Sequence, residues 1–238
     1  MRGISGCEHR LMRMTLGGRD PVRRRVAEEI RAALIAGGLE AGRVYSAPAL
    51  AAELGVSATP VREAMQALAR DGMVEVVPNT GFRVTEVTPA ELDRLVELRL
   101  LLEVPIMGEV AEHHDARDEP RIEALRAIAD TMIAAEGRND MVAYMAADTD
   151  FHTAFLELHG NPEIVQVVRR ARERSRLLGL LPLAEAGQLA ATTEEHHRMV
   201  DLALARDRAG MEDLVRRHIA HVRDEWAGPA SPPQLTSR

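Results

Sequence analysis

Cysteine and aromatic residues are scarce in this sequence. The single cysteine, Cys7, excludes an internal disulfide and favours a reducing, cytoplasmic setting. Aromatic residues make up only 3% of the 238 residues, so the core must be built from aliphatic side chains and methionine. This composition favours helices over β-sandwiches and barrels. We therefore predict a mostly α-helical protein.

Long hydrophobic runs and lysine are absent as well. No stretch reaches the roughly 18 apolar residues of a transmembrane helix, so we expect no membrane span. The early arginines Arg2, Arg10 and Arg13 are not followed by the apolar segment of a secretory signal peptide, and we expect none. All 30 basic residues are arginine, which is more typical of genome base composition than of a function.

The acidic excess is confined to one part of the chain. The net charge is −7, but residues 1–88 hold 12 arginines against 10 acidic residues, and residues 89–238 hold 18 against 27. The two segments therefore carry net charges of +2 and −9. This asymmetry predicts two domains with different partners.

Residues 46–84 have the order of elements of a winged helix-turn-helix. Ser46 can cap a short helix that ends at Gly55, and Ser57 or Thr59 can cap a second helix that ends at Gly72. Two β-rich segments, 73–77 and 82–85, then flank a glycine-containing turn. An earlier helix is predicted from Asp20-Pro21 to Gly37-Gly38. This order and spacing are typical of a DNA reader.

The second helix of such a motif presents its N-terminal residues to the major groove. Ser57 and Thr59 would donate to phosphates, and Arg62 would reach a phosphate or a guanine edge. Gln66 projects from the same helix. Arg23, Arg24 and Arg25 cluster in the first turn of the earlier helix, where positive charge opposes the helix dipole. A nearby polyanion would compensate for this charge; an ordinary solvated face is the alternative.

The segment Leu-Gly-Val-Ser-x-Thr-Pro-Val-Arg-Glu-Ala (54–64), with Asp-Gly-Met-Val (71–74) and the Asn-Thr-Gly wing, resembles the GntR family of bacterial transcription regulators. The resemblance implies a homodimer that binds a pseudo-palindromic double-stranded DNA operator. Three positions that are often basic in the family read Ala58, Thr80 and Ala47-Pro48 here. We expect Arg23–Arg25 and Arg83 to replace part of this lost charge, and the salt dependence of binding to be weakened.

The rest of the chain has the pattern of a helical bundle. Thr88-Pro89-Ala90-Glu91 forms a capping box at the predicted domain boundary. Helices are predicted over residues 89–114, 119–136, 140–159, 162–177, 192–205 and 208–226. Breaks at Gly137, at Gly160-Asn161-Pro162 and over 178–191 separate them.

Eight of the nine histidines lie in this second segment. Asp148 and His152 are four residues apart and share a helical face, and His196 and His218 lie beside apolar stripes of the last two helices. Buried imidazoles and carboxylates must be satisfied, and a divalent metal would satisfy all four. The ligand set suits Zn²⁺ or Ni²⁺, with Mn²⁺ or Fe²⁺ as further candidates. Asp148 and His152 could instead be a simple hydrogen-bonded pair.

Asp-x-x-Phe-His (148–152), Gly160-Asn161, His196 and His218 resemble the FCD ligand-binding domain of the FadR subfamily. The resemblance implies a metal on Asp148, His152, His196 and His218, with a carboxylate effector at its open positions. It also implies effector contacts from Arg99 and Asn161, although Arg99 could be a surface arginine. The remaining histidines of this segment are expected to be surface or outer-shell groups: His113, His114, His159, His197 and His221.

These patterns together predict four segments and one main function. The segments are a flexible arm (1–19), a winged helix-turn-helix (20–87), an all-α effector and metal domain (88–227) and a disordered tail (228–238). The predicted function is a transcription regulator, most often a repressor in the resembling family, whose operator binding responds to a small organic acid. A regulator that senses the metal itself is the alternative. A metal-dependent hydrolase is a remote one, because no general base is placed by a motif.

Overall fold

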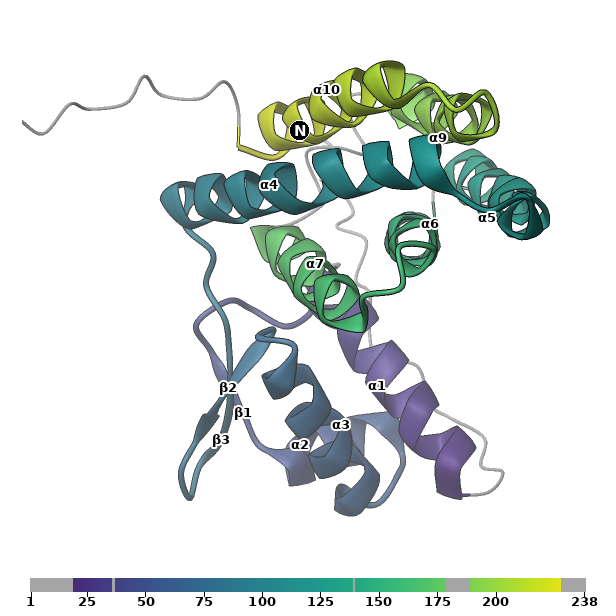
Figure 1. Cartoon of the computed structure of the whole chain (residues 1–238). Helices are drawn as coiled ribbons and strands as arrows, with labels where there is room; N and C mark the ends of the chain where they lie inside the picture. The colour runs from purple at the N-terminus through teal and green to yellow at the C-terminus, as the bar shows by residue number, and fades with distance from the viewer. Residues whose placement is uncertain (1–18, 36, 139, 179–188, 228–238) are drawn as a thin grey trace, which may run out of the picture. The chain divides into compact units, whose positions relative to one another are not determined.

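A computed structural model describes residues 19–35, 37–138, 140–178 and 189–227 (Figure 1). The predicted arm up to residue 18 and the predicted tail from residue 228 lie outside the described residues. The chain divides into two compact units, one of Met1–Val87 with Arg172–Leu180 and one of Thr88–Ala171 with Leu181–Arg238. One division therefore falls between Val87 and Thr88. The assignment of Arg172–Leu180 to the first unit has no counterpart in the sequence-based boundaries.

The first unit combines three helices with a small sheet in its described residues before Thr88. The helices are α1 (Arg19–Ile35), α2 (Ala47–Leu54) and α3 (Ala58–Arg70), and the strands are β1 (Val44–Tyr45), β2 (Val74–Val77) and β3 (Gly81–Val84). The sheet is antiparallel in the order β1-β3-β2, with β2 and β3 forming the predicted wing hairpin. Strand β1 was not predicted, because two residues are too short to show an alternating pattern.

Local capping explains where α2 begins and ends, but not where α3 begins. The Ser46 hydroxyl accepts a hydrogen bond from the amide of Ala49 at 3.3 Å, as expected of an N-cap. Gly55 ends α2 with a φ of 69°, a conformation that glycine adopts without a steric penalty. Ser57 occupies the N-cap position of α3, but its side chain makes no capping hydrogen bond, which corrects the expected role. Thr59 lies inside the helix.

Before Thr88, the described part of this unit has an apolar core, whereas the segment 172–178 that is counted with the unit buries Arg172, Glu173 and Arg176. Leu50, Leu54, Val61, Met65 and Leu68 are fully buried between α2, α3 and the sheet side of the motif. No ionisable side chain is buried among the described residues before Thr88. Gly81 is required at the start of β3, because a Cβ atom there would collide with the backbone carbonyl of Tyr45 on β1.

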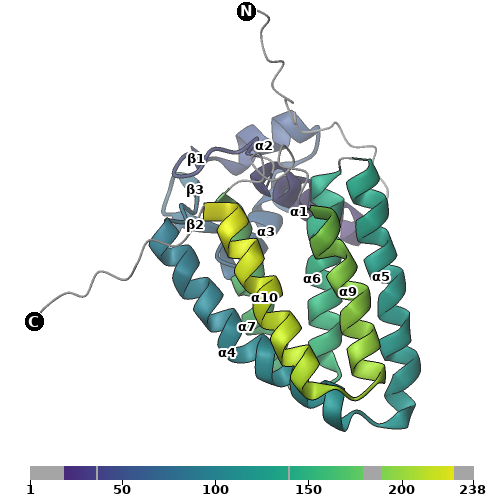
Figure 2. The same cartoon turned by 90° about the horizontal axis from the view of Figure 1, so that it is seen from above.

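The second unit is helical. Its helices are α4 (Pro89–His113), α5 (Glu119–Gly137), α6 (Met141–Glu157), α7 (Pro162–Ser175, whose last turn is counted with the first unit), α9 (Leu189–Leu204) and α10 (Arg208–Ala227). Short 3-10 turns cover Ala116–Asp118 and Arg176–Leu178. Helices α4 and α10 lie side by side, as do α5, α6 and α9 (Figure 2). The predicted mostly α-helical fold, with a winged helix-turn-helix and an all-α domain, is confirmed.

The helix ends follow the sequence signals closely, with one notable shift. Thr88 caps α4, since its hydroxyl accepts a hydrogen bond from the amide of Glu91 at 3.2 Å. Helix α9 begins at Leu189, three residues before the predicted start, because Leu189-Ala190-Ala191 are good helix formers. None of the described helices is long and apolar enough to cross a membrane.

Candidate metal centre

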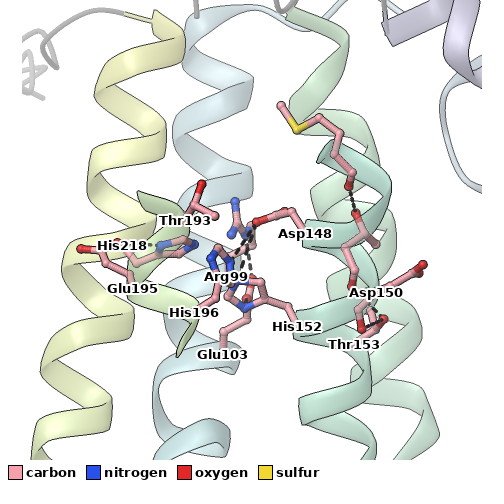
Figure 3. A network of polar contacts seen from close by, with 12 residues as sticks. Arg99, Glu103, Asp148, Asp150, His152, Thr153, Thr193, Glu195, His196 and His218 are labelled. Carbon is pink, nitrogen blue, oxygen red and sulfur yellow. Dashed lines mark hydrogen bonds and ion pairs between the residues drawn. The ribbon is translucent and has the colours of Figure 1, made fainter. Parts of the chain in front are cut away.

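The structure brings together the four predicted ligand residues inside the second unit. Asp148 and His152 come from α6, His196 from α9 and His218 from α10. One potential ligand atom from each residue lies within 4.8 Å of the others. Figure 3 shows the four side chains converging between the helices. Residues up to 70 positions apart in sequence thus share one small volume.

The helix geometry explains this convergence. Asp148 and His152 are one turn apart on α6, and Asp148 Oδ1 lies 3.9 Å from His152 Nε2. The same oxygen lies 3.4 Å from Nε2 of His196 on the neighbouring α9. The three imidazole centroids are 4.8 to 5.3 Å apart, and Phe151 packs edge-on against His196 at 4.8 Å. The aromatic contact holds the ring of His196 toward Asp148.

The burial of these groups matches what a cation would require. The side chains of His152, His196 and His218 are fully buried, and that of Asp148 is 12% exposed. Neither ring nitrogen of His196 has a hydrogen-bond partner among the described residues. An unsatisfied buried nitrogen costs about 1–3 kcal/mol, whereas a metal ion would accept its lone pair. The residues present therefore fit a divalent metal.

A second layer of ionisable groups surrounds the four. Glu103 Oε2 on α4 lies 3.1 Å from His152 Nδ1, and His218 Nδ1 hydrogen-bonds to Glu195 Oε2 on α9 at 2.8 Å. Arg99, which is 2% exposed, donates from Nε to Glu103 Oε1 at 2.7 Å. The alternative that Arg99 is a surface arginine is therefore wrong.

Carboxylates outnumber the guanidinium among the four proposed ligands and the side chains that surround them. Asp148, Glu103 and Glu195 offer three carboxylates, and Arg99 offers one guanidinium. With neutral imidazoles, ionised carboxylates would leave two net negative charges in a largely buried volume. Such a charge is costly in a medium of low polarity unless it is neutralised. A divalent ion supplies the charge of the required sign and size.

Glu103 and Glu195 were missed by the sequence analysis. Glu103 follows Arg99 by one helical turn, and this i,i+4 spacing was an available signal for the ion pair. Glu195 precedes His196 directly, and its contact is with His218, 23 residues later. No spacing rule links a residue on one helix to a histidine on the next. Tertiary packing alone makes that contact.

The other candidate residues of this unit lie elsewhere. Asn161 is exposed, and its side-chain oxygen accepts a hydrogen bond from the amide of Glu163 at the start of α7. The structure does not bring it into the cluster. His114 is buried, contrary to the surface position expected for it, with Nδ1 3.2 Å from carbonyl oxygens of its own helix.

Three further histidines contact acidic residues outside the cluster. His113 lies 3.3 Å from Glu112, His159 lies 3.6 Å from Glu109, and His197 lies 3.1 Å from Asp130. His113 is 70% exposed, and the side chains of His159 and His197 are 27% and 29% exposed. The side chain of His221 is outside the described part of the structure.

The candidate DNA-contacting residues of the first unit lie on its surface. Ser57, Thr59, Arg62 and Gln66 are exposed along the first turns of α3. Arg23, Arg24 and Arg25 are exposed on α1. Arg83 on β3 is half-exposed and lies 4.0 Å from Glu75 on the paired strand, which offsets part of its charge. The N-terminal part of α3 therefore offers one arginine, Arg62, among polar side chains, and the wing offers Arg83 with part of its charge offset by Glu75.

Comparison with known proteins covers both units. Residues 22–84 match the bacterial regulatory proteins of the gntR family, and residues 94–221, more than half of the chain, match the FCD domain. The probable D-xylose utilization operon transcriptional repressor of Paenarthrobacter nicotinovorans is 30% identical over 72% of this chain and 74% of its own length. An uncharacterized HTH-type regulator in an unstable DNA locus of Streptomyces ambofaciens is 29% identical, over 85% of this chain and 84% of its own.

Solved structures give the same fold. The structure of McbR/YncC from E. coli superposes with a TM-score of 0.69 and 24% identity, over 84% of this chain and 94% of the other. Relatives and domains of this kind are transcriptional regulators rather than enzymes. The chain thus belongs to the GntR family of DNA-binding transcriptional regulators, with an N-terminal winged helix-turn-helix and a C-terminal FCD domain.

Proposed function

We propose that this regulator changes its operator affinity when a small carboxylate binds beside a divalent metal in the FCD domain. Asp148, His152, His196 and His218 hold the metal, with Zn²⁺ or Ni²⁺ best suited to one carboxylate and three imidazoles. The observation that carries the proposal is the convergence of these four side chains in a buried volume. We further propose that the protein acts as a repressor, as the name of the Paenarthrobacter relative states for that protein.

The residues around the metal give the effector its chemistry. A bound metal supplies Lewis-acid positions for the oxygen atoms of a carboxylate. Arg99 is buried in the same cluster, and Glu103 holds its Nε, which fixes the orientation of the guanidinium. A planar guanidinium held in this way recognises a carboxylate by paired hydrogen bonds. We therefore assign a small organic acid, such as a sugar acid, as the effector class.

The DNA-reading unit supplies the output. We propose that two chains form a homodimer in which each α3 enters a major groove, with Arg62 contacting a base or phosphate and Ser57 and Thr59 contacting phosphates. Effector binding then favours one arrangement of the two reading units over another. The effector can change operator affinity only if it binds one of these arrangements more tightly than the other. The size of the change is limited by that difference in effector affinity.

Equilibrium dialysis of the full-length protein tests this proposal. The operator is first selected from random duplex DNA. The affinity of the protein for this operator is then measured with and without a chelator, and with lactate, D-gluconate or citrate as candidate effectors. The dialysis shows how much metal stays bound under each condition. We expect the metal to stay bound while at least one acid changes operator affinity by about 5–150-fold, the usual range of allosteric coupling. Operator affinity that follows metal occupancy alone would instead identify a metal sensor.

A further inference from the structure

Glu195 lies outside the proposed ligand set but contacts one of its members. Its Oε2 atom is 2.8 Å from Nδ1 of His218, and the geometry is that of a hydrogen bond. Glu195 is on α9 and His218 on α10, so the contact joins two helices that each carry one ligand (Figure 3). The carboxylate is 16% exposed, and the imidazole is fully buried. A hydrogen bond in this setting has little competition from water.

Glu103 has a similar place beside another ligand. Its Oε2 atom lies 3.1 Å from Nδ1 of His152, and its Oε1 atom accepts from Arg99. Glu103 and His152 come from α4 and α6 and are both fully buried. In both pairs, therefore, a glutamate from a neighbouring helix contacts the Nδ1 side of a ligand imidazole. The repetition indicates a common role.

A neutral imidazole has one N–H and one lone pair, and the hydrogen bond made by one nitrogen decides which role the other takes. An ionised carboxylate can only accept, so Nδ1 of His218, which hydrogen-bonds to Glu195, carries the hydrogen. Glu103 approaches Nδ1 of His152 at 3.1 Å and favours the same tautomer there by its charge. Nε2 then presents its lone pair. For His152 and His196, Nε2 is the nitrogen that contacts Asp148 Oδ1, at 3.9 and 3.4 Å. The Nε2 side is thus the one turned to the shared volume.

We propose that Glu195 and Glu103 are positioning residues, which fix the Nε2 atoms of His218 and His152 toward the metal and raise the affinity of the site for it. This inference rests on the proposed metal site but concerns two residues outside it. Outer partners of this kind typically contribute 10–100-fold to metal affinity, because they orient the ring and increase its basicity. Glu103 also binds Arg99, so it connects a metal ligand with the proposed effector-binding guanidinium.

Glu195 gives the sharper test of the two. Removal of Glu103 would leave the buried Arg99 guanidinium without its ion-pair partner, which is strongly destabilising by itself. Glu195 is partly exposed, so its removal leaves less buried charge behind. The adjacent Glu194 is exposed on the same turn of α9 and provides a matched control.

The experiment measures Zn²⁺ affinity of the full-length protein by competition with a chromophoric chelator. We expect Glu195→Ala to weaken binding by about 10–100-fold, Glu195→Gln to weaken it less because its carbonyl still accepts from Nδ1, and Glu194→Ala to leave it unchanged. Nitrogen-15 spectra of the zinc-loaded protein give a second readout. They should show His218 with Nδ1 protonated and Nε2 bound in the wild type, with that pattern lost in Glu195→Ala.

Three results would overturn the inference, and they are distinguishable from one another. Wild-type affinity and an unchanged His218 spectrum in Glu195→Ala would show that Glu195 does not position the ring. Equal weakening in Glu194→Ala would show a general effect of the helix. A wild-type protein that binds neither zinc nor nickel would overturn the proposed function together with this inference. If Glu195→Ala fails to fold, Glu195→Gln must still show a measurable loss of affinity.

Discussion

The described residues before Thr88 bury only apolar side chains, whereas the helices that follow bury charged and polar groups that include Arg99, Glu103, Asp148 and four histidines. Before Thr88, Arg62 at the start of α3, Arg23–Arg25 on α1 and Arg83 on β3 are exposed, whereas Arg172 and Arg176, which are counted with the first unit, are buried. Burying charged side chains makes folding less favourable, so a domain with a purely structural role is not expected to bury them. The contrast between the exposed arginines before Thr88 and the buried cluster of α4, α6, α9 and α10 supports the proposal that the first contact DNA and the second holds a small ligand.

This division of labour has a thermodynamic consequence. Each unit has its own core, so a change inside one should alter its own ligand much more than that of the other. Coupling between an effector and an operator is limited to a few kcal/mol in typical regulators. Substitution of a buried residue can change the stability of its own unit by more than this coupling free energy. Separate measurements of metal content and DNA affinity therefore show which unit a substitution affects.

The largest expected effect is loss of the metal on His218→Ala. Removal of one of four ligands should weaken Zn²⁺ binding by at least ~100-fold, beyond the usual contribution of an outer-shell partner. DNA binding in the absence of effector should persist, because the described core of the first unit before Thr88 contains no part of the site. Metal analysis after dialysis measures the change, with the exposed neighbour Arg217→Ala as the control. Full metal content in His218→Ala would show that the site is misassigned.

A second prediction concerns a substitution in the core of the first unit, away from the proposed metal site. Leu68 is fully buried on α3, and Leu68→Ala should cost about 2–5 kcal/mol of stability through lost contacts and a cavity. Amide hydrogen exchange over α2 and α3 should accelerate and operator binding should fall, while zinc content stays at the wild-type level. Leu68→Met keeps most of the volume and should cost less than about 1.5 kcal/mol. Simultaneous loss of zinc in Leu68→Ala would contradict the independence of the two units.

A smaller effect is expected from the proposed reading residue. Arg62→Ala should cost about 1–3 kcal/mol of operator binding if the guanidinium contacts a base edge. Arg70 is exposed at the other end of α3. Arg70→Ala therefore removes one positive charge from the same helix at a position away from its N-terminus, and serves as the control. Fluorescence anisotropy with the selected operator and with a scrambled duplex separates specific from general binding. Equal affinity of Arg62→Ala and the wild type would exclude the assigned contact.

The smallest effect is a gain of function. Ala58 occupies the first position of α3, and Ala58→Arg should add about one phosphate contact. The slope of log affinity against log salt concentration should then steepen by about 0.9. Ala205→Arg, an exposed change in the second unit, is the control for added charge. An unchanged slope in Ala58→Arg would mean that the residue does not reach the DNA backbone.

The fold was largely predictable from local signals. Ser46, Gly55 and Thr88 act through hydrogen bonds and dihedral angles within a few residues, so the sequence shows where helices start and end. The convergence of the four proposed ligands was predictable because Asp148 and His152 share a helix face and the remaining two histidines lie in a family pattern. Strand β1 was not predicted, because its two residues pair with a segment some 40 positions later in the sequence.

The surroundings of the site were less predictable. The partner of His218 is Glu195 on another helix, and only the packing of α9 against α10 brings the two together. Asn161 looked like a site residue in the sequence pattern, yet its side chain bonds to the backbone of Glu163. Sequence spacing specifies contacts along one helix. It does not specify which faces of two helices meet, because many long-range contacts decide that together.

Anomalous X-ray diffraction from crystals of the full-length protein loaded with zinc tests the central claim most directly. The account predicts one strong peak per chain, bounded by the Nε2 atoms of His152, His196 and His218 and by the carboxylate of Asp148. A peak at another group of residues, or zinc bound through the Nδ1 atoms of His152 and His218, would contradict it.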